Sequence, residues 1–363
     1  MKTPEISIIL PCRNEEESLD FCLRTIKQTI KNHKLNAEII VSDSSTDNSP
    51  EIAKKHKVKL IKHNKKGYGI AYLEAFKKSK GKYIFMADSD GSYDFKQIPK
   101  FIKYLEKGYD FVIGDRFKGK IQENAMPFSH KYFGNPILSF LLRLFYKTKI
   151  NDAHCGIRAI TKKSLDKLNL QTTGMEFASE MIVKALQNNL KIKEIPINYY
   201  KRKGNSKLKS FSDGWRHLRF MLMYAPNYLF IIPGILLTIL GIILILTLKN
   251  NVVYGCFSIL IGYQIISLGI YTKTHMKSLG LIKSDKLIDS LAKIIKFETG
   301  IYIALIIILL SLLLKIEPIF NHLSTSLSFP PQSLVVLGLT ISIIGIQTMF
   351  SAFFISIQLV SRK

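Results

Sequence analysis

Apolar and polar positions divide the chain into two unlike halves. Residues 1–224 alternate short apolar runs with charged segments, whereas long uncharged stretches follow from residue 225. A membrane-spanning helix needs about 20 apolar residues, and three of the stretches meet that length. The third is shorter, but Ile316 extends it and Lys315 can snorkel to the bilayer surface. We therefore predict four transmembrane helices, over residues 225–248, 250–272, 299–314 and 332–360.

Basic residues predict which ends of these helices face the cytoplasm. Lysines are concentrated in residues 273–298, between the second and third helices, and that loop also has an amphipathic pattern. Further basic residues precede residue 225, and the chain ends in Arg362 and Lys363. The other two loops carry little charge. We expect a multi-pass membrane protein with no secretory leader, whose N-terminal half lies on the cytoplasmic side.

The N-terminal half has the pattern of an α/β domain with a mostly parallel, Rossmann-like sheet. Apolar runs predict strands, helical periodicity predicts the segments between them, and three strands end in polar turns. Ligands bind at the carboxyl ends of such strands, so these turns predict one site. The predicted strands are residues 7–10, 38–42, 58–62 and 83–87, the helices are 16–32, one from about 50 and 67–79, and the polar turns are 11–15, 43–47 and 88–90.

The third polar turn holds two carboxylates, Asp88 and Asp90, directly after a buried strand. Carboxylates held this close repel one another, and a divalent cation neutralises them. A solvated acidic turn is the alternative for an isolated pair of this kind. The other two polar turns at the same edge favour a binding site.

The net charge limits the classes of binding partner, and the cysteine spacing indicates the redox state of the thiols. The net charge is +25 and the pI is about 9.7, which predicts anionic partners. The basic residues flank the predicted membrane helices, so anionic lipid explains them better than nucleic acid. Four cysteines show neither metal-ligand nor disulfide spacing, which indicates reduced thiols.

Several motifs occur in the order found in family 2 glycosyltransferases of the GT-A fold, and residues 5–225 resemble the branch of dolichyl-phosphate mannose and glucose synthases. The motifs are Pro11-Cys12-Arg13-Asn14-Glu15, Asp43-Ser44-Ser45, Asp88-Ser89-Asp90, Gly114-Asp115-Arg116, Met126-Pro127, Gly134-Asn135-Pro136, Asp152-Ala153-His154-Cys155-Gly156-Ile157-Arg158, the run 172–180, Arg202-x-Gly204-x-Ser206-Lys207 and the run 213–220.

The resemblance implies a site for a nucleotide sugar. Asp88 and Asp90 would hold Mg²⁺ or Mn²⁺ and the nucleotide diphosphate, and Arg116 would face the donor or acceptor phosphate as a catalytic residue. The residues implied around the nucleotide are Pro11, Arg13, Glu15, Asp43 and Asp88.

A phosphate acceptor is already anionic at neutral pH, so it requires positive charge more than a strong general base. Arginine suits bidentate phosphate contacts, and Arg202 and Lys207 stand just before the membrane region. Glu176 and Glu180 are predicted to support neighbouring groups, and His154 and His217 to be structural. The candidates for the acceptor phosphate are Lys131, Arg158, Arg202, Ser206 and Lys207.

The sequence thus predicts a cytoplasmic GT-A domain over residues 1–210, an interfacial helix over 211–224 that contains Trp215, and a transmembrane domain over 225–363. The predicted reaction is inverting, metal-dependent transfer of one hexose from UDP-glucose, GDP-mannose or UDP-N-acetylglucosamine to a dolichyl or polyprenyl phosphate at the cytoplasmic leaflet. The oligomeric state stays open, and no nucleic acid is expected.

Two alternatives remain. Processive polysaccharide synthases share the fold, but they usually carry Q-x-x-R-W, and Trp215, the only tryptophan, follows Asp-Gly instead. A non-catalytic nucleotide-sugar-binding membrane protein is the second, and the complete motif set argues against it.

Overall fold

The computed structural model describes residues 3–204, 210–248, 252–278, 288–290, 297–313, 322, 325 and 331–360. The chain forms two compact units, Met1–Tyr224 and Ala225–Lys363. Most of the predicted amphipathic loop 273–298 lies outside the described residues, as do Ser206 and Lys207. All four cysteines are buried and free.

Unit 1 is built on a seven-stranded sheet in the order β3-β2-β1-β4-β6-β5-β7. Strand β6 runs antiparallel to both of its neighbours, whereas the other pairs are parallel, so the sheet is mixed. The strands are β1 (Ile6–Cys12), β2 (Ala37–Asp43), β3 (Lys59–Lys62), β4 (Tyr83–Met86), β5 (Phe111–Asp115), β6 (Arg158–Thr161) and β7 (Ile192–Pro196).

Helices between the strands bury their apolar stripes in one core with the sheet. In α1 the side chains of Leu19, Leu23 and Ile26 are fully buried, as their spacing predicts. Pro50 stands in the first turn of α2, where its missing N–H costs nothing. The helices of unit 1 are α1 (Glu16–Asn32), α2 (Ser49–Lys55), α3 (Tyr68–Phe76), α4 (Ile98–Glu106), α5 (Asn135–Tyr146), α6 (Lys162–Leu168), α7 (Phe177–Gln187) and α8 (Ser210–Met223), with a 3-10 turn η1 (Phe95–Gln97) and a π-helix η2 (His130–Gly134).

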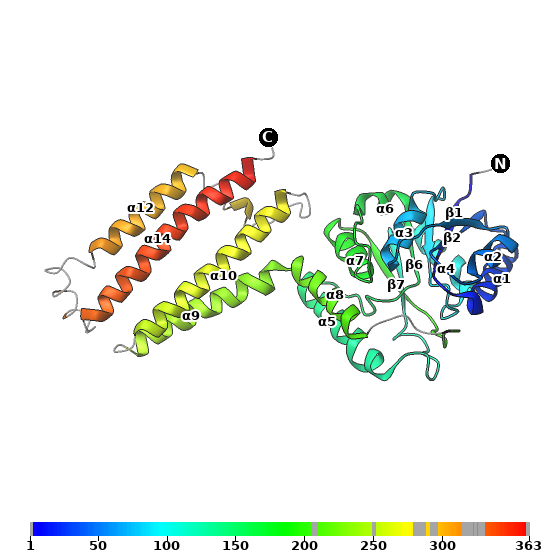
Figure 1. Cartoon of the computed structure of the whole chain (residues 1–363), viewed down its shortest axis with the longest axis horizontal. Coiled ribbons are helices and arrows are strands. Elements are labelled where there is room, and N and C mark those ends of the chain that lie inside the picture. The colour runs from blue at the N-terminus through cyan, green and yellow to red at the C-terminus, as the bar shows by residue number, and fades with distance from the viewer. Residues whose placement is uncertain are drawn as a thin grey trace. The chain divides into compact units, whose positions relative to one another are not determined.

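Unit 2 consists of long apolar helices, with α10 packed beside α9 and α14, and α12 beside α14 (Figure 1). Among the described residues, three segments are long and apolar enough to cross a membrane, namely Asn227–Thr247, Val252–Ser278 and Gln332–Gln358. This is one fewer than the sequence predicted. The predicted transmembrane helix over residues 299–314 corresponds to α12. Its 17 residues span about 25 Å, which is short of the roughly 30 Å hydrocarbon core. The helices are η3 (Asn227–Ile231), α9 (Ile232–Thr247), α10 (Val252–Ser278), α12 (Phe297–Leu313) and α14 (Pro331–Val360).

Glycines bring the backbones of α9 and α10 into close contact. Gly234 and Gly241 lie seven residues apart on α9, and Gly255 and Gly262 lie seven apart on α10. A Cβ atom at Gly241 would lie 2.6 Å from the carbonyl oxygen of Gly255, and one at Gly234 would lie 2.8 Å from that of Gly262. Small residues at such positions let membrane helices pack by direct backbone contact.

We expect Gly241→Leu to separate α9 from α10, because the added side chain has no space at the Gly255 carbonyl. Overpacking of this kind costs about 1–3 kcal/mol. Thermal unfolding of the detergent-solubilised full chain should shift to lower temperature. The matched control is Leu240→Ile on the exposed side of α9, and an equal melting temperature for both variants would contradict the glycine contact.

Candidate active site

The carboxyl ends of β1, β2 and β4 meet at one edge of the sheet. β1 pairs in parallel with β2 on one side and with β4 on the other, and Cys12 stands in register with Asp43. The three polar turns that follow these strands are therefore neighbours. This edge brings together the residues that the sequence places in a nucleotide-sugar site.

Asp88 and Asp90 follow β4, and neighbouring groups fix both carboxylates. The Tyr68 hydroxyl donates to Oδ1 of Asp88 at 3.0 Å. The backbone N–H of Ser92 donates to Oδ1 of Asp90 at 2.9 Å. Tyr68 comes from the first turn of α3, so that helix positions one member of the pair.

The residue between the two carboxylates ties this turn to the rest of the edge. The Ser89 hydroxyl donates to the carbonyl oxygen of Pro11 at 2.6 Å, and its own carbonyl accepts from the Ser18 hydroxyl at 2.7 Å. Gly156 passes close by, since a Cβ atom there would lie 2.4 Å from Oδ2 of Asp88. Any larger residue at position 156 would displace this carboxylate.

The carboxylate pair lacks sufficient counter-charge. Burial, together with the charge of Asp90, raises the pKa of Asp88 to about 7. The Tyr68 hydrogen bond and the charges of Arg202 and Arg116 offset this only in part. Two oxygen ligands with unbalanced negative charge fit a hard divalent cation. No cluster of three or more His, Cys, Asp or Glu suited to a metal occurs in the described parts of the chain, so further ligands of such a cation would be water or oxygens of a bound substrate.

Arg202, from the loop after β7, links two of the three turns. Its Nη2 atom lies 3.2 Å from Oε1 of Glu15, and its Nη1 atom lies 3.6 Å from Oδ2 of Asp90. Its Nε atom is buried and has no hydrogen-bond partner among the described residues. The guanidinium therefore places a positive charge beside Asp90 and Glu15.

Asp43 is fully buried at the end of β2. The Ser45 hydroxyl donates to its Oδ1 atom at 2.6 Å, and the backbone N–H of Asn14 donates to that hydroxyl at 2.7 Å. The Oδ2 atom is buried without a partner within the described ranges. A buried acceptor in this state is suited to an N–H donor from a ligand. Pro11 is half-buried nearby on the same edge, and Arg13 is exposed.

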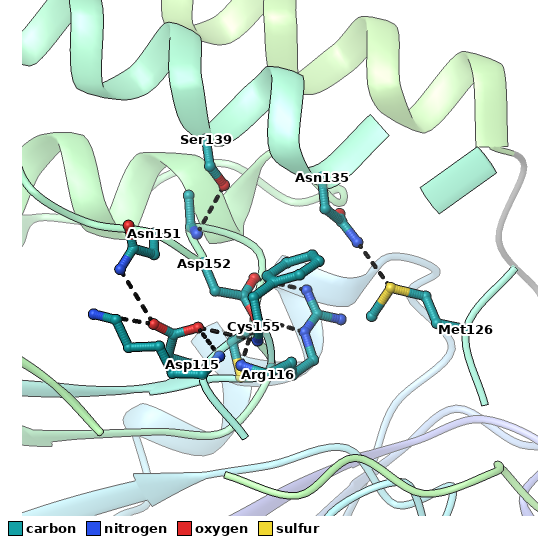
Figure 2. Close-up of polar contacts among 12 residues, drawn as sticks. Asp115, Arg116, Met126, Asn135, Ser139, Asn151, Asp152 and Cys155 are labelled. Atoms are coloured by element: carbon teal, nitrogen blue, oxygen red, sulfur yellow. Dashed lines mark hydrogen bonds and ion pairs between the residues drawn. The ribbon is translucent and has the colours of Figure 1, made fainter. Parts of the chain in front are cut away.

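Arg116 is 6% exposed and binds Asp152 rather than standing open to a ligand (Figure 2). Its Nε and Nη2 atoms donate to the two carboxylate oxygens at 2.7 and 2.8 Å, and its backbone N–H donates to the same group at 3.0 Å. The Ser139 hydroxyl also accepts from the backbone of Ala153 at 3.2 Å. Arg116 thus ties the loop 151–155 to the end of β5, and it still weakens the negative potential at Asp88.

Arg158 has a structural environment that the sequence did not indicate. It is 2% exposed, and its three side-chain nitrogens donate to the backbone carbonyls of Cys155, Ala178 and Ala153 at 2.8–2.9 Å. The predicted contact with an acceptor phosphate is therefore not supported for this residue. Lys131 is half-buried in η2, with its Nζ 5.2 Å from the Tyr132 ring centre.

The sequence did not predict that His154 and His217 meet. The Ser179 hydroxyl lies 3.3 Å from Nε2 of His154 and 2.9 Å from Nδ1 of His217, and the two rings are 4.3 Å apart. This group joins α8 to the loop that holds Arg116. The two histidines are 63 positions apart, so only tertiary structure reveals the contact.

Known protein families match both halves of the chain. Residues 7–168 match the family model for glycosyl transferase family 2, and residues 270–358 match that for the C-terminal transmembrane region of the same family. The chain is 34% identical to the low-salt glycan biosynthesis hexosyltransferase Agl6 of Haloferax volcanii, over 96% of this chain and 88% of that protein. It is 28% identical to the dolichyl-phosphate hexose transferase of the same organism, over 58% of this chain and 89% of that protein.

Solved structures resemble unit 1 in fold. Glucosyl-3-phosphoglycerate synthase of Mycobacterium tuberculosis, crystallised with Mn²⁺, UDP and glucosyl-3-phosphoglycerate, has a TM-score of 0.50 at 16% identity, over 62% of this chain and 80% of that one. Mannosyl-3-phosphoglycerate synthase of Rubrobacter xylanophilus has a TM-score of 0.51 at 16% identity, over 61% and 74%. These likenesses show a GT-A-like fold.

We expect the buried histidine pair to make the folded chain less stable in acid. Burial, together with the charge of Arg158, lowers the pKa of His217 from 6.5 to about 4. The unfolded chain therefore binds a proton first as the pH falls from about 6.5 towards 4, which destabilises the fold by on the order of 3 kcal/mol. The melting temperature should fall as the pH is lowered over this range, and it should fall less steeply in His217→Gln.

The control for this pH series is His33→Gln, at the exposed end of α1. It should leave the slope of the wild-type chain unchanged. Equal slopes in the wild type and His217→Gln would show that the buried pair does not govern acid stability.

Proposed function

The chain belongs to glycosyl transferase family 2, and we propose that it transfers one hexose from a nucleotide sugar to a polyprenyl phosphate of the dolichyl type. It is a glycosyltransferase related to dolichyl-phosphate hexose transferases. The observation that carries the proposal is the convergence of Asp88, Asp90 and Arg202 at one edge of the sheet. Two carboxylates suited to a metal ion thus lie beside an arginine suited to a phosphate.

The nucleotide sugar is proposed to lie along the ends of β1, β2 and β4. Asp43 would accept a hydrogen bond from the base through its unpartnered oxygen. Pro11, Arg13 and Glu15 would line the base and ribose. Asp88 and Asp90 would hold Mg²⁺ or Mn²⁺ against the diphosphate, where the ion supplies Lewis-acid stabilisation of the leaving group. The similar synthase of Mycobacterium tuberculosis was crystallised with Mn²⁺ and UDP together, which supports this assignment.

The acceptor is proposed to attack from the side of Arg202. An oxygen of the lipid phosphate forms a bond to the anomeric carbon while the bond from that carbon to the donor diphosphate breaks, and the nucleoside diphosphate leaves. A single in-line displacement inverts the anomeric centre and gives a β-linked product. The phosphate oxygen is already anionic, so the chain's contribution is to hold two phosphates that repel each other.

The residues proposed to hold the two phosphates lie in different parts of the chain. Arg202 stands at the site, and it would exchange its contact with Asp90 for the incoming phosphate. Lys131, on η2, is also proposed to contact the acceptor phosphate. The same role is proposed for Ser206 and Lys207, which lie outside the described residues. Arg116 is proposed to act through its charge and through the loop that it holds. Arg158 has no part in this proposal, because its nitrogens already bind backbone carbonyls.

The proposed membrane arrangement keeps four spans and a cytoplasmic catalytic unit. α12 is the short one, and the sequence extends its apolar run to Ile316. An even number of spans returns both chain ends to one side, which agrees with the basic residues before residue 225 and at the C-terminus. The product would then form at the cytoplasmic leaflet, on a lipid that serves glycan assembly.

Incubation of the purified full chain with a polyprenyl phosphate, UDP- or GDP-hexoses and Mn²⁺ or Mg²⁺ tests the proposal. We expect one donor to give a glycolipid with a single β-linked hexose, and mass spectrometry with NMR would identify it. Chains of several sugars would instead indicate a processive enzyme. Nucleotide-sugar binding without any product would indicate a non-catalytic protein.

We expect Asp90→Ala to lower the transfer rate by roughly 10²–10³, the usual cost of removing a group that stabilises developing charge. Initial rates of glycolipid formation at saturating metal would measure it. Asp166→Ala is the matched control, because that carboxylate is 62% exposed on α6. Full transfer by Asp90→Ala would contradict the proposed mechanism.

A further inference from the structure

Two histidines from distant parts of unit 1 share one hydroxyl group. His217 belongs to α8 and His154 to the loop before β6, and Ser179 in the first turn of α7 stands between them. The Ser179 Oγ atom lies 2.9 Å from Nδ1 of His217 and 3.3 Å from Nε2 of His154. Ser179 is fully buried and His217 is 6% exposed. This chain of contacts, named here the histidine bridge, therefore joins α8 to the loop from inside the fold.

Both rings of the histidine bridge are uncharged at neutral pH. Burial, together with the charge of Arg158, lowers the pKa of His217 to about 4. Burial also lowers the pKa of His154 well below 6.5. A hydroxyl group has one proton to donate, and a neutral imidazole has one donor and one acceptor nitrogen. One ring therefore donates its N–H to Ser179 while Ser179 donates to the other ring, and this directional pair of hydrogen bonds constrains the orientation of His154 as well as its position.

The loop that carries His154 also contacts the carboxylate pair. Gly156 stands two residues after His154, and a Cβ atom at Gly156 would lie 2.4 Å from Oδ2 of Asp88. The backbone N–H of Gly156 donates to the Tyr93 hydroxyl at 2.8 Å. Arg158 binds the carbonyl oxygens of the residues on either side of His154. Because the backbone between His154 and Gly156 is short and held at several points, a shift of His154 would be felt at Asp88.

We propose that His154, Ser179 and His217 are positioning residues for Asp88. The histidine bridge orders the loop 153–156, and the ordered loop limits where the Asp88 carboxylate can lie. The three side chains act through this loop, as groups that orient a metal ligand commonly do. The ordering of the loop is independent of the proposed transfer reaction, whereas the effect on a bound ion rests on the proposed function.

Asparagine and glutamine variants distinguish hydrogen bonding from packing at the two histidines. The side-chain amide of Asn occupies the place of Nδ1 of a histidine, and that of Gln the place of Nε2. Since Ser179 contacts Nδ1 of His217, we expect His217→Asn to keep more of the bridge than His217→Gln. Ser179 contacts Nε2 of His154, so His154→Gln should keep more than His154→Asn. A packing role would favour Gln, the larger side chain, at both positions.

Hydrogen exchange of the metal-free full chain, followed by mass spectrometry, tests whether the bridge orders the loop. Peptides that contain Gly156 should exchange about fivefold faster in His217→Gln and in His154→Asn, the effect of losing one hydrogen bond. The other two variants should stay closer to the wild type. Equal exchange in all chains, or a preference for Gln at both positions, would overturn the proposal. Faster exchange throughout unit 1, β1 included, would show that the bridge holds the whole fold and would also overturn it.

Mn²⁺ binding by the same variants, measured by electron paramagnetic resonance with UDP or GDP present, tests whether the loop positions Asp88. We expect affinity to fall about tenfold in His217→Gln and His154→Asn, the usual cost of disturbing a group that orients a metal ligand. His33→Asn is the control, because His33 is exposed at the end of α1. Faster loop exchange with unchanged Mn²⁺ affinity would overturn the proposal. A wild-type chain that binds no Mn²⁺, with the order of exchange as expected, would contradict the proposed function and confirm the bridge's hold on the loop.

Discussion

The site depends on the mutual repulsion of two carboxylates at the end of β4. Asp88 is held by Tyr68 and Asp90 by the backbone of Ser92, so neither can move away to relieve the repulsion. Burial of Asp88 and the charge of Asp90 beside it together raise the pKa of Asp88 to about 7. The proposed divalent cation and the guanidinium of Arg202 would both offset this negative charge.

The surrounding fold serves to hold that pair and to bring positive charge to it. Parallel pairing of β1 with β2 and β4 places three polar turns side by side. The chain then returns after β7 to place Arg202 between Glu15 and Asp90. On the other side of Asp88, Gly156 permits close approach of the loop that Arg116 ties to β5 through Asp152 (Figure 2).

The sequence predicted the parts of this arrangement that local patterns determine. Strand and helix periodicity located β1 to β4 and α1 closely, and the order of the strands indicated the shared edge. It did not predict that Arg158 binds backbone carbonyls, or that His154 meets His217, because those contacts depend on how the chain folds back on itself. It also did not distinguish the core face of α5 from its exposed face, since both are apolar and only packing separates them.

The most direct test of the account is Mn²⁺ binding by the full chain, measured by electron paramagnetic resonance with UDP or GDP present. We expect Mn²⁺ to bind together with one nucleoside diphosphate, and Asp90→Asn, which keeps the size of the side chain but removes its charge, to abolish that binding. Phosphorus relaxation should place the ion at the diphosphate. Unchanged Mn²⁺ affinity in Asp90→Asn would contradict the claim that the carboxylate pair after β4 organises the site.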